Sequence, residues 1–537
     1  MNDTVTNQAP PLEGYDAYAA DAGLVTAVRR ASVQWIEGAA SDLGRFVGSA
    51  GAQSLAATAN RNLPQLKTHD RWGRRIDFVE YDPAYHALME RAISRGVHSL
   101  AWKRQSGGFA GRAVLFYLWN QLEQGTACPI TMTFASIPVL EHAPDIARAW
   151  KPKVLSDAYD PRPLPIGEKA GATVGMAMTE KQGGSDLRAV QTNATPAGDS
   201  YRLEGHKWFC SAPMSDAFFT LARAAEGVTC FFVPRSLPDG TRNDFQIQRL
   251  KDKCGNRSNA SSEIEYHGTH AWLVGEPGRG IATLIEMAHH TRFDIVVGVA
   301  GMMRAALNQA IHHARHRSAF GKHLADHALM SNVLADLALE TEAAMLLAFR
   351  LAQAFDASAA DPRERELQRI LTPIAKYWLC KRITPVAVEA MECLGGNGYV
   401  EEAPLARLYR EAPLNGIWEG SANVICLDAL RAITRAPESL AALSKEISSA
   451  GDARIEKHLS WVTRTLADPV AAEGQARAIV ETLALCVQAS LMTRFSDATA
   501  ALAFIDARLG GEGLRAFGTL PAGVDTKSIV ERAALRS

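Results

Sequence analysis

The sequence contains no pair of cysteines in a Cys-x-x-Cys arrangement. Its eight cysteines are scattered over 537 residues, and none has the spacing to another cysteine or to a histidine that zinc ligands need. This pattern excludes a disulfide-stapled scaffold and a structural zinc module. Scattered cysteines are typical of reduced, mostly buried thiols, so we expect a cytoplasmic protein.

Long hydrophobic runs are also missing. No uninterrupted apolar stretch approaches about 18 residues, the length that a membrane-spanning helix requires. The N-terminus, MNDTVTNQAPPLEGYD, has no basic segment followed by an apolar run, as a secretory signal would. We therefore expect no membrane partner.

Excess charge of either sign is small. The 57 lysines and arginines against 58 aspartates and glutamates give a net charge of −1 at pH 7. No overall field would draw such a chain to nucleic acid or to an acidic membrane, which leaves only a local basic face open. Hydrophobic residues at 47% and charged residues at 21% exclude collagen-like, coiled-coil and mostly disordered chains. At about 150 residues per domain, the length predicts three or four domains.

The pattern of apolar residues changes along the chain. Residues 21–151 show helical spacing, with one stripe running through Phe109, Val114, Leu118 and Leu122. From about residue 171, six short runs rich in β-branched and aromatic residues are separated by PAGD, PDG and GNRSN turns, which predicts a small β domain. The six runs are residues 173–178, 200–210, 217–224, 228–235, 245–250 and 262–274.

Helical spacing returns at residue 281, in three long stretches at 281–320, 329–355 and 371–394. A last helical segment, 439–537, holds eleven Lys and Arg and eleven Asp and Glu. We therefore predict a mainly α protein with a β-barrel-like middle domain. Strands and helices do not alternate, which excludes a Rossmann chain. The predicted domains are 1–170 (N-terminal helical), 171–280 (middle β), 281–437 (helical bundle) and 438–537 (additional helical).

Two loops of the β region carry groups that suit a ligand. In MAMTEKQGGSDL, residues 176–187, the amides freed by the two glycines and the hydroxyls of Thr179 and Ser185 suit a polar ring edge or a phosphate. A polar hairpin loop without a ligand is the more ordinary interpretation. In GHKWFCSAP, residues 205–213, an aromatic side chain would stack on a flat ligand and Ser211 would donate a hydrogen bond. A core strand with its two aromatic residues on opposite faces explains the same segment.

Two further segments would suit phosphates. The guanidinium of Arg317 in RSAFGK fits a pyrophosphate bidentately, and the Gly395–Gly396 turn in ECLGGNGYVEE lets the backbone approach a phosphate closely. The alternatives are a solvated helix end for Arg317 and a helix C-cap for the two glycines.

The segment GIWEGSANVICLDALR, residues 416–431, holds a lone acid, Glu419, among small and apolar residues just before a helical pattern. Desolvation there would raise the pKa of this carboxyl and make it a usable base near neutral pH. An acid that caps the helix beginning near Ser421 is an equal alternative. Elsewhere, His312 and His316 share one helical face without an acidic partner at zincin spacing, so we predict a polar helix face and no metal.

Taken together and in this order, the four segments make residues 171–435 resemble the acyl-CoA dehydrogenase family of FAD flavoproteins. One branch, that of the alkylation-response proteins, resembles the chain more closely still, in MTEKQGGSD, GHKWF, CFFVPR, RLKDKCGNRSNAS, IWEGSANVICLD, NQAPPLEGYD and PITMTFASIPVL. The resemblance implies an acyl-CoA dehydrogenase fold with a four-helix bundle and an additional C-terminal helical domain, assembled as a homotetramer. It also implies FAD between the β domain and the bundle.

Glu419 occupies the position of the family's catalytic base. The resemblance implies that it removes the α-proton of an acyl-CoA thioester while the flavin accepts the β-hydride. The backbone amide of Glu419 and a flavin ribityl hydroxyl would be the donors to the developing enolate oxygen.

Other roles are implied position by position. Arg317, Phe320, Gly395 and Gly396 would reach the cofactor of a neighbouring subunit. The substrate side would be lined by Thr179, Ser185, Ser211 and Asn423. The remaining cofactor contacts would be Met178, Thr179, Ser185, Phe209, Cys210, Ser211, Ile417, Trp418, Gly420, Ser421 and Asn423.

Three positions depart from the family pattern. Phe209 stands in place of the usual tryptophan, Glu392 stands where many members have glutamine, and Asn423 follows the base where it would narrow the acyl pocket. These departures bear on turnover rather than on flavin binding.

The alkylation-response branch has little activity on ordinary acyl-CoA substrates and is associated with binding of double-stranded DNA by its last domain. Residues 439–537 carry no net positive charge to attract DNA phosphates. DNA binding would therefore need basic residues gathered on one face. The candidates are Arg431, Arg435, Arg454, Lys457, Arg464, Arg494, Arg508 and Arg515.

Two hypotheses follow. The first is an FAD-binding acyl-CoA dehydrogenase-like enzyme of low activity, which acts on a short or branched acyl-CoA and is linked to the response to DNA alkylation. The alternative is a protective protein that binds double-stranded DNA and in which the flavin site is mainly structural.

Overall fold

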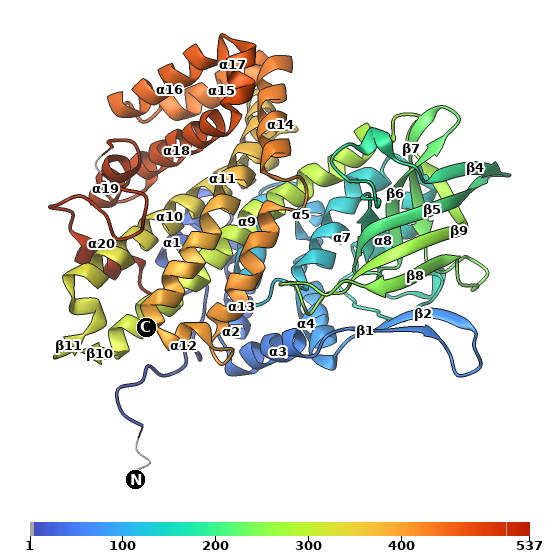
Figure 1. Ribbon diagram of the computed structural model, residues 1–537, viewed down its shortest axis with the longest axis horizontal. Helices are drawn as coiled ribbons and strands as arrows, with labels where there is room; N and C mark the ends of the chain where they lie inside the picture. Colours follow the sequence, from blue (N-terminus) through green and yellow to red (C-terminus); the bar gives the residue numbers. More distant parts are fainter. Residues whose placement is uncertain (1–4, 512, 537) are drawn as a thin grey trace. The chain divides into compact units, whose positions relative to one another are not determined.

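The computed structural model describes residues 5–511 and 513–536 (Figure 1). The chain divides into two compact units, each built from separate stretches of the sequence. The helical unit contains residues up to 50, 109–122 and 292–537, and the sheet unit contains 51–108 and 123–291. The four consecutive domains stay a prediction, because these units group the chain differently.

The sheet unit is organised around a seven-stranded mixed sheet (Figure 1). All six predicted strands are confirmed. The sequence missed β4, whose residues NATPA lack both alternation and aromatic side chains. The strands are β3 (Val174–Ala177), β4 (Asn193–Ala197), β5 (Ser200–Ser211), β6 (Ala217–Ala224), β7 (Gly227–Pro234), β8 (Phe245–Leu250) and β9 (Ser261–Val274).

The pairings of five strands close into a ring. β4, β5, β9, β7 and β6 pair in that order, and β6 returns to β4 through one residue pair, Arg223 and Asn193. β3 and β8 pair with β6 and β9 outside the ring. The barrel-like middle domain is therefore confirmed in general form, but its closure is loose.

A two-stranded hairpin interrupts the helices of the sheet unit. β1 (Gln65–His69) and β2 (Arg75–Glu80) pair antiparallel across the turn DRWGR. The sequence analysis placed this stretch in a helical domain, and for the hairpin that prediction is wrong. The helices of the unit are α3 (Ala50–Arg61), α4 (Pro83–Ser94), α5 (Leu100–Lys103), α7 (Ala127–Leu140), α8 (Pro144–Val154), η2 (Ile166–Glu168) and η3 (Leu187–Ala189).

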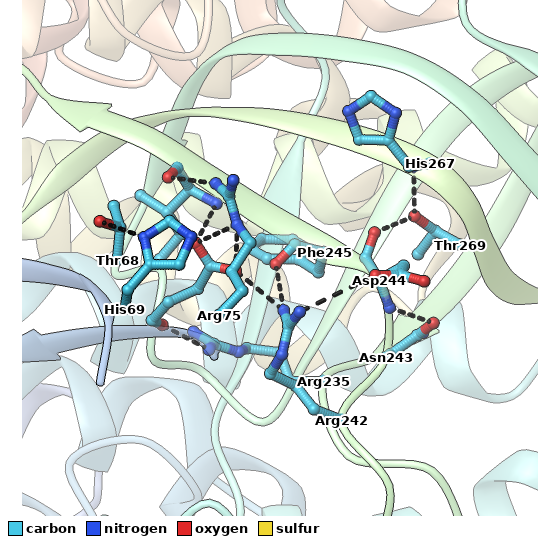
Figure 2. A network of polar contacts seen from close by, with 12 residues as sticks. Thr68, His69, Arg75, Arg235, Arg242, Asn243, Asp244, Phe245, His267 and Thr269 are labelled. Atoms are coloured by element: carbon cyan, nitrogen blue, oxygen red, sulfur yellow. Dashed lines mark hydrogen bonds and ion pairs between the residues drawn. The ribbon is translucent and has the colours of Figure 1, made fainter. Parts of the chain in front are cut away.

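The hairpin is fixed to β8 by one buried carboxylate. Asp77 is fully buried and has a left-handed backbone with φ +45°. Its carboxylate accepts hydrogen bonds from Arg75 and Arg242, each at 2.9 Å, and from the backbone N–H of Ile247 at 3.0 Å. Figure 2 shows Arg75, Arg235 and Arg242 within one network of polar contacts. Because a buried charge without partners is costly, this network sets the position of the hairpin against the sheet.

The helical unit is a bundle around three long helices. α9 (Gly280–His316), α10 (Ala328–Ala357) and α11 (Pro362–Leu394) confirm the three predicted helical stretches, and α9 belongs to this unit from residue 292 onward. α11 begins where the Asp361 carboxylate accepts a hydrogen bond from the N–H of Arg363 and a proline takes the first helical position.

Shorter elements complete the helical unit. They are α1 (Ala22–Arg30), η1 (Gln34–Ile36), α2 (Glu37–Val47), α6 (Gly108–Leu122), β10 (Ser318–Ala319), β11 (Lys322–His323), η4 (Leu324–Asp326), α12 (Gly396–Tyr399), α13 (Pro404–Glu411), η5 (Ala412–Gly416), α14 (Ala422–Arg435), α15 (Pro437–Ser448), α16 (Ala453–Leu466), α17 (Pro469–Gly474), α18 (Ala476–Phe495), α19 (Ala498–Arg508) and α20 (Thr526–Ala533).

The last hundred residues are helical, as predicted, and are packed into the bundle. α18 packs on α10, α11, α14 and α16, and α20 returns to α10 and α1. The carbonyl of Ala533 accepts a hydrogen bond from Arg304 of α9 at 2.8 Å, and the N–H of Arg536 donates to the carbonyl of Ala20 at 3.0 Å. This segment therefore closes the bundle and is not a separate tail.

One helix in the described part of the chain, α18, is long and apolar enough to cross a membrane by composition, with a mean hydropathy of 1.3. The apolar run is interrupted by Glu481 and Gln488, so the absence of an uninterrupted run stands. In the structure, 61% of the helix window is buried, and Gln488 accepts a hydrogen bond from the indole N–H of Trp378 at 2.8 Å. α18 packs as a core helix.

A buried ion pair links the loop after β3 to strand β5. Lys207 and Glu180 are 0% and 1% exposed, and Nζ of Lys207 lies 2.7 Å from Oε1 of Glu180. The carboxylate also accepts hydrogen bonds from the N–H groups of Gln191 at 2.7 Å and Thr192 at 3.1 Å. Burial acts to raise the pKa of Glu180, but the charge and hydrogen bond of Lys207 outweigh it and lower the pKa to about 2.

We expect Lys207→Met to lower the free energy of unfolding by about 3–5 kcal/mol, because it leaves the Glu180 carboxylate buried without its cation. Urea unfolding followed by circular dichroism measures the change. Lys181→Met is the matched control: its side chain is 55% exposed, so its effect should stay within about 0.5 kcal/mol. Equal destabilisation by the two substitutions would contradict the structural role of the pair.

Candidate functional site

The loop after β3 is held against β5 at its first residues. The carbonyl of Thr179 accepts a hydrogen bond from the backbone N–H of Trp208 at 2.8 Å. Gly184 is required by packing, since a Cβ there would lie 2.3 Å from Oγ1 of Thr179. Met178 and Thr179 are half-buried and Ser185 is exposed. The structure thus brings the Thr179 loop beside the strand that carries the second predicted segment.

Strand β5 turns an aromatic ring to the surface beside this loop. Phe209 is 51% exposed, and its ring centroid lies 4.8 Å from Nζ of Lys251. A core strand with both aromatic residues packed does not account for this exposure. Ser211 is half-buried, with its Oγ 3.2 Å from Oγ of Ser261.

Cys210 faces the interior of the sheet. Its thiol is fully buried, and burial raises its pKa to about 12. The cofactor contact at Cys210 stays a prediction, and because alternation along the strand turns the side chain inward, such a contact would involve its backbone.

Glu419 lies in a tight turn between η5 and α14. Its backbone has φ +57°, in the left-handed region that glutamate rarely adopts. The Oε2 atom of its carboxylate is buried. The N-cap of α14 is Ser421, two residues later, so Glu419 does not occupy the capping position that was the alternative.

Two buried cations hold the backbone of this turn. Nε of Arg292 donates to the carbonyl of Glu419 at 2.9 Å, and Nζ of Lys376 donates to the carbonyl of Gly420 at 2.6 Å. Arg292 is fixed in turn by the carboxylate of Asp428 at 2.9 Å. Burial lowers the pKa of Lys376. Since a strained backbone persists only where its surroundings over-determine it, these contacts account for the left-handed backbone conformation of Glu419.

Neither cation was predicted from the sequence. Their partners lie 127 and 44 positions away, so no local pattern reveals the contacts. For Lys376 one signal was present: it is a lone cation within the apolar run LTPIAKYWL, and at 1% exposure it needs a polar partner.

The neighbours of Glu419 offer apolar surface and one polar donor. Ile417 is 65% exposed. The indole N–H of Trp418 is buried and has no hydrogen-bond partner in the described part of the chain. Oδ1 of Asn423 accepts a hydrogen bond from Nε of Arg477 at 2.8 Å. Arg477 comes from α18 and is a further residue that the sequence analysis did not single out.

The Arg317 and Gly395 segments meet around the N-terminal residues. The carbonyl of Asn7 accepts a hydrogen bond from Arg317, and Oε1 of Gln8 accepts one from Nδ2 of Asn397 at 3.2 Å. Phe320 is 95% exposed. We call Arg317, Phe320 and residues 395–397 the phosphate cluster.

The two predicted glycines differ. Gly395 ends α11 with φ +60°, so for Gly395 the C-cap alternative is confirmed. A Cβ on either glycine would meet no atom within 4 Å in the described part of the chain, so both positions leave room for the close approach of a ligand. Only Gly395 has a backbone conformation that favours glycine.

The phosphate cluster and the Glu419 turn contact positions of α9 that lie far apart along the helix. Arg292, which holds the turn, and His316, which precedes Arg317, are 24 residues apart in α9. At about 1.5 Å per residue, this separation is about 36 Å.

These residues fit a flavin dinucleotide. Phe209 in the sheet unit and Ile417 in the helical unit are large apolar side chains that the fold leaves exposed, and each offers a surface on which a flat aromatic ring can pack. Phe320 is exposed separately, in the phosphate cluster. The buried indole N–H of Trp418 supplies a donor without a partner of its own. Arg317 and the open space at Gly396 suit a pyrophosphate.

Half of the basic residues considered for a DNA-binding face are engaged within the chain. The pairs are Arg431–Asp428 at 3.7 Å, Arg454–Asp452 at 2.6 Å, Arg494–Glu446 at 2.8 Å and Arg508–Glu340 at 3.1 Å. A guanidinium committed to a carboxylate offers less to a phosphate. Lys457 and Arg464 are exposed on α16, two turns apart.

Across residues 5–511 and 513–536, no group of three or more His, Cys, Asp or Glu could hold a metal ion. The rings of His312 and His316 lie 4.3 Å apart, and Nε2 of His312 is 2.8 Å from the carbonyl oxygen of Pro10.

Family models match three stretches of the chain. The adaptive response protein AidB N-terminal domain matches residues 7–161, the acyl-CoA dehydrogenase middle domain matches 175–269, and the acyl-CoA dehydrogenase C-terminal domain matches 278–434. The last two matches contain the Thr179 loop, β5, the phosphate cluster and the Glu419 turn.

Individual proteins show the same likeness. AidB of Escherichia coli (strain K12) is 48% identical over 436 residues, which cover 80% of this chain and 80% of the relative. Acyl-CoA dehydrogenase family member 11 of Caenorhabditis elegans is 31% identical over 432 residues, 76% of this chain and 69% of the relative. The crystal structure of Caenorhabditis elegans ACDH-11 in complex with C11-CoA has the same fold, with a TM-score of 0.85 at 24% identity over 99% of this chain and 93% of that one.

The resemblance read from the motifs is thereby confirmed, and with it the fold class and the cofactor. The chain belongs to the acyl-CoA dehydrogenase family of FAD-dependent oxidoreductases, in the branch that carries an AidB-type N-terminal domain.

Proposed function

We propose that the chain catalyses α,β-dehydrogenation of an acyl-CoA thioester with Glu419 as the base. The observation that carries this proposal is the turn at Glu419, whose left-handed backbone is held by Arg292 and Lys376. When bound, FAD supplies the acceptor for the hydride that leaves the β-carbon. Removing the α-proton is the task of Glu419.

A base of this kind must be close to the α-proton and shielded from water. A misplacement of about 1 Å can cost about 10²-fold in rate, so a turn fixed through two carbonyls has a direct effect on catalysis. The burial of Oε2 of Glu419 supports the requirement that the base be shielded from water. In the sheet unit, Thr179 and Ser211 carry hydroxyls on the segments that the family places at the flavin and substrate.

For the substrate we propose a short or branched acyl-CoA. By resemblance, Asn423 would narrow the space for the acyl chain, and its hydrogen bond from Arg477 in the first turn of α14 supports a fixed position for its side chain. The C11-CoA complex of ACDH-11 supports CoA thioesters as the ligand class. We further propose low turnover and a role in the response to DNA alkylation, which the description of the matched N-terminal domain as an adaptive response protein supports.

We also propose that the active form is a homo-oligomer, a homotetramer by resemblance. Arg292, which donates to the Glu419 carbonyl, and His316, which precedes Arg317, are separated by about 36 Å along α9, and we propose that one FAD does not contact both regions of the same chain. Arg317, Phe320 and Gly396 would therefore complete the cofactor site of a neighbouring copy.

Substituting Glu419→Gln removes the base and keeps the shape of the side chain. We expect FAD to stay bound and the bleaching of its absorbance by isobutyryl-CoA or isovaleryl-CoA, followed anaerobically, to slow by about 10²- to 10⁴-fold. Glu402→Gln, at an exposed glutamate of the same unit, should bleach like the wild type. Unchanged bleaching by the Glu419 variant, or no bleaching of the wild type by any acyl-CoA, would overturn the proposal.

Substituting Lys376→Met fills the same space but donates nothing to the Gly420 carbonyl. We expect kcat for the same substrates to fall by about 10- to 100-fold, while KM and the amount of bound FAD stay nearly unchanged. The reason is that the turn loses one of the two hydrogen bonds from buried cations to its backbone. Lys381→Met, at an exposed lysine of the same helix, is the matched control. A kcat equal to that of the control would show that the hold on Gly420 does not matter for the base.

Binding of double-stranded DNA is a second proposal. It is favoured by the exposure of Lys457 and Arg464 two turns apart on α16, where both could reach one backbone. It is weakened by the ion pairs of Arg431, Arg454 and Arg494.

Removing residues 439–537 would not test DNA binding, since it would strip α18 from the core of the bundle. The charge reversal Lys457→Glu with Arg464→Glu keeps the fold intact. If α16 binds DNA, this variant should lose affinity at least about tenfold, and the slope of log affinity against log salt should shrink by about two. Reversal of two exposed cations of the sheet unit, Lys67→Glu with Arg148→Glu, is the control. Equal affinities for the two variants would rule out α16 as the DNA-binding face.

A further inference from the structure

The side-chain amide of Asn7 forms the two hydrogen bonds to β10 that the backbone of a neighbouring strand would form. Its Nδ2 donates to the carbonyl of Ser318 at 2.8 Å, and the N–H of Ser318 donates to its Oδ1 at 2.7 Å. Asn7 has φ +56°, a backbone conformation that asparagine tolerates better than most residues. Both backbone groups of the residue after Arg317 are thus fixed by one amide.

Arg317 itself is held at three further points. Its N–H donates to the carbonyl of His313 at 2.9 Å, and its carbonyl accepts from the N–H of Leu324 at 2.9 Å. Its guanidinium donates through Nη1 to the backbone carbonyl of Asn7. That contact uses one of five N–H donors and orients the planar group, so the others can still bind an anion.

The same N-terminal residues reach the other part of the phosphate cluster. Oε1 of Gln8 accepts a hydrogen bond from Nδ2 of Asn397 at 3.2 Å, and the carbonyl oxygen of Pro10 lies 2.8 Å from Nε2 of His312. Residues 7–10, which we call the strap, therefore contact the last turn of α9, β10 and α12. The match to the AidB N-terminal domain begins at residue 7, so the strap is part of that domain.

We propose that Asn7 is a positioning residue for the FAD phosphates. The strap holds Arg317 and the Gly396–Asn397 turn in the arrangement that a diphosphate needs, before the cofactor arrives. A long arginine side chain loses conformational freedom on binding, and a contact that orders it beforehand removes that cost from the binding step. This inference rests on the proposed function, in which Arg317 and Gly396 contact the cofactor.

The test compares FAD affinities of the apoprotein, measured by quenching of flavin fluorescence. Asn7→Gly removes the side-chain amide and keeps the left-handed backbone. We expect its Kd for FAD to rise about fivefold, the equivalent of about one hydrogen bond, with no change in the melting temperature of the apoprotein. Thr6→Ala, at an exposed neighbour, should bind FAD like the wild type.

A double-mutant cycle separates positioning from general stabilisation. Arg317→Ala should weaken FAD binding more than Asn7→Gly does. Because Asn7 acts through Arg317, the double variant should bind no more weakly than Arg317→Ala alone.

Additive effects in this cycle would overturn the positioning role of the strap but not the proposed function. An FAD affinity of Asn7→Gly equal to that of Thr6→Ala would do the same. A wild-type chain that binds no FAD would instead overturn the proposed function.

Discussion

The helical unit depends on hydrogen bonds from two buried cations to two adjacent backbone carbonyls. Glu419 adopts a left-handed backbone that its own side chain disfavours, so the conformation must be imposed from outside. Arg292 of α9 and Lys376 of α11 impose it through Glu419 and Gly420. Burying two cations is costly unless each is compensated, and Asp428 of α14 compensates the first. Three helices of the bundle thus converge on one turn.

The sequence predicted the strands and helices whose apolar residues repeat along one face or along both faces. The six strands and three long helices follow from patterns that repeat within each element. β4 and the β1–β2 hairpin escaped because each depends on distant partners: β4 on its pairing with β5, and the hairpin on the buried carboxylate of Asp77 and its arginines. Glu419 was found because it is a lone acid among apolar residues. Arg292 and Arg477 were not, because an arginine on a helix is ordinary until its partner is known.

The last helices carry charges that pair with charges of the bundle. Residues 439–537 hold eleven basic and eleven acidic residues, and some of these form ion pairs with α10. Glu446 of α15 binds Arg350 of α10 at 2.9 Å, and Arg508 of α19 binds Glu340 of α10 at 3.1 Å. Such partly buried pairs specify how the last helices dock on the bundle. A macromolecular partner of this face would have to use the cations that these pairs leave exposed.

The length of α9 separates the two functional ends of the helical unit. A helix of 37 residues keeps Arg292, which donates to the Glu419 carbonyl, about 36 Å from His316 beside Arg317. The proposed base and the proposed phosphate-binding groups of one copy therefore lie far apart along this helix. In the proposed homo-oligomer, one cofactor would contact groups from two chains. In such an arrangement the order of the Arg317 end cannot come from the Glu419 end of the same chain. It must be built locally, and residues 7–10 are the segment that contacts α9, β10 and α12 at that end.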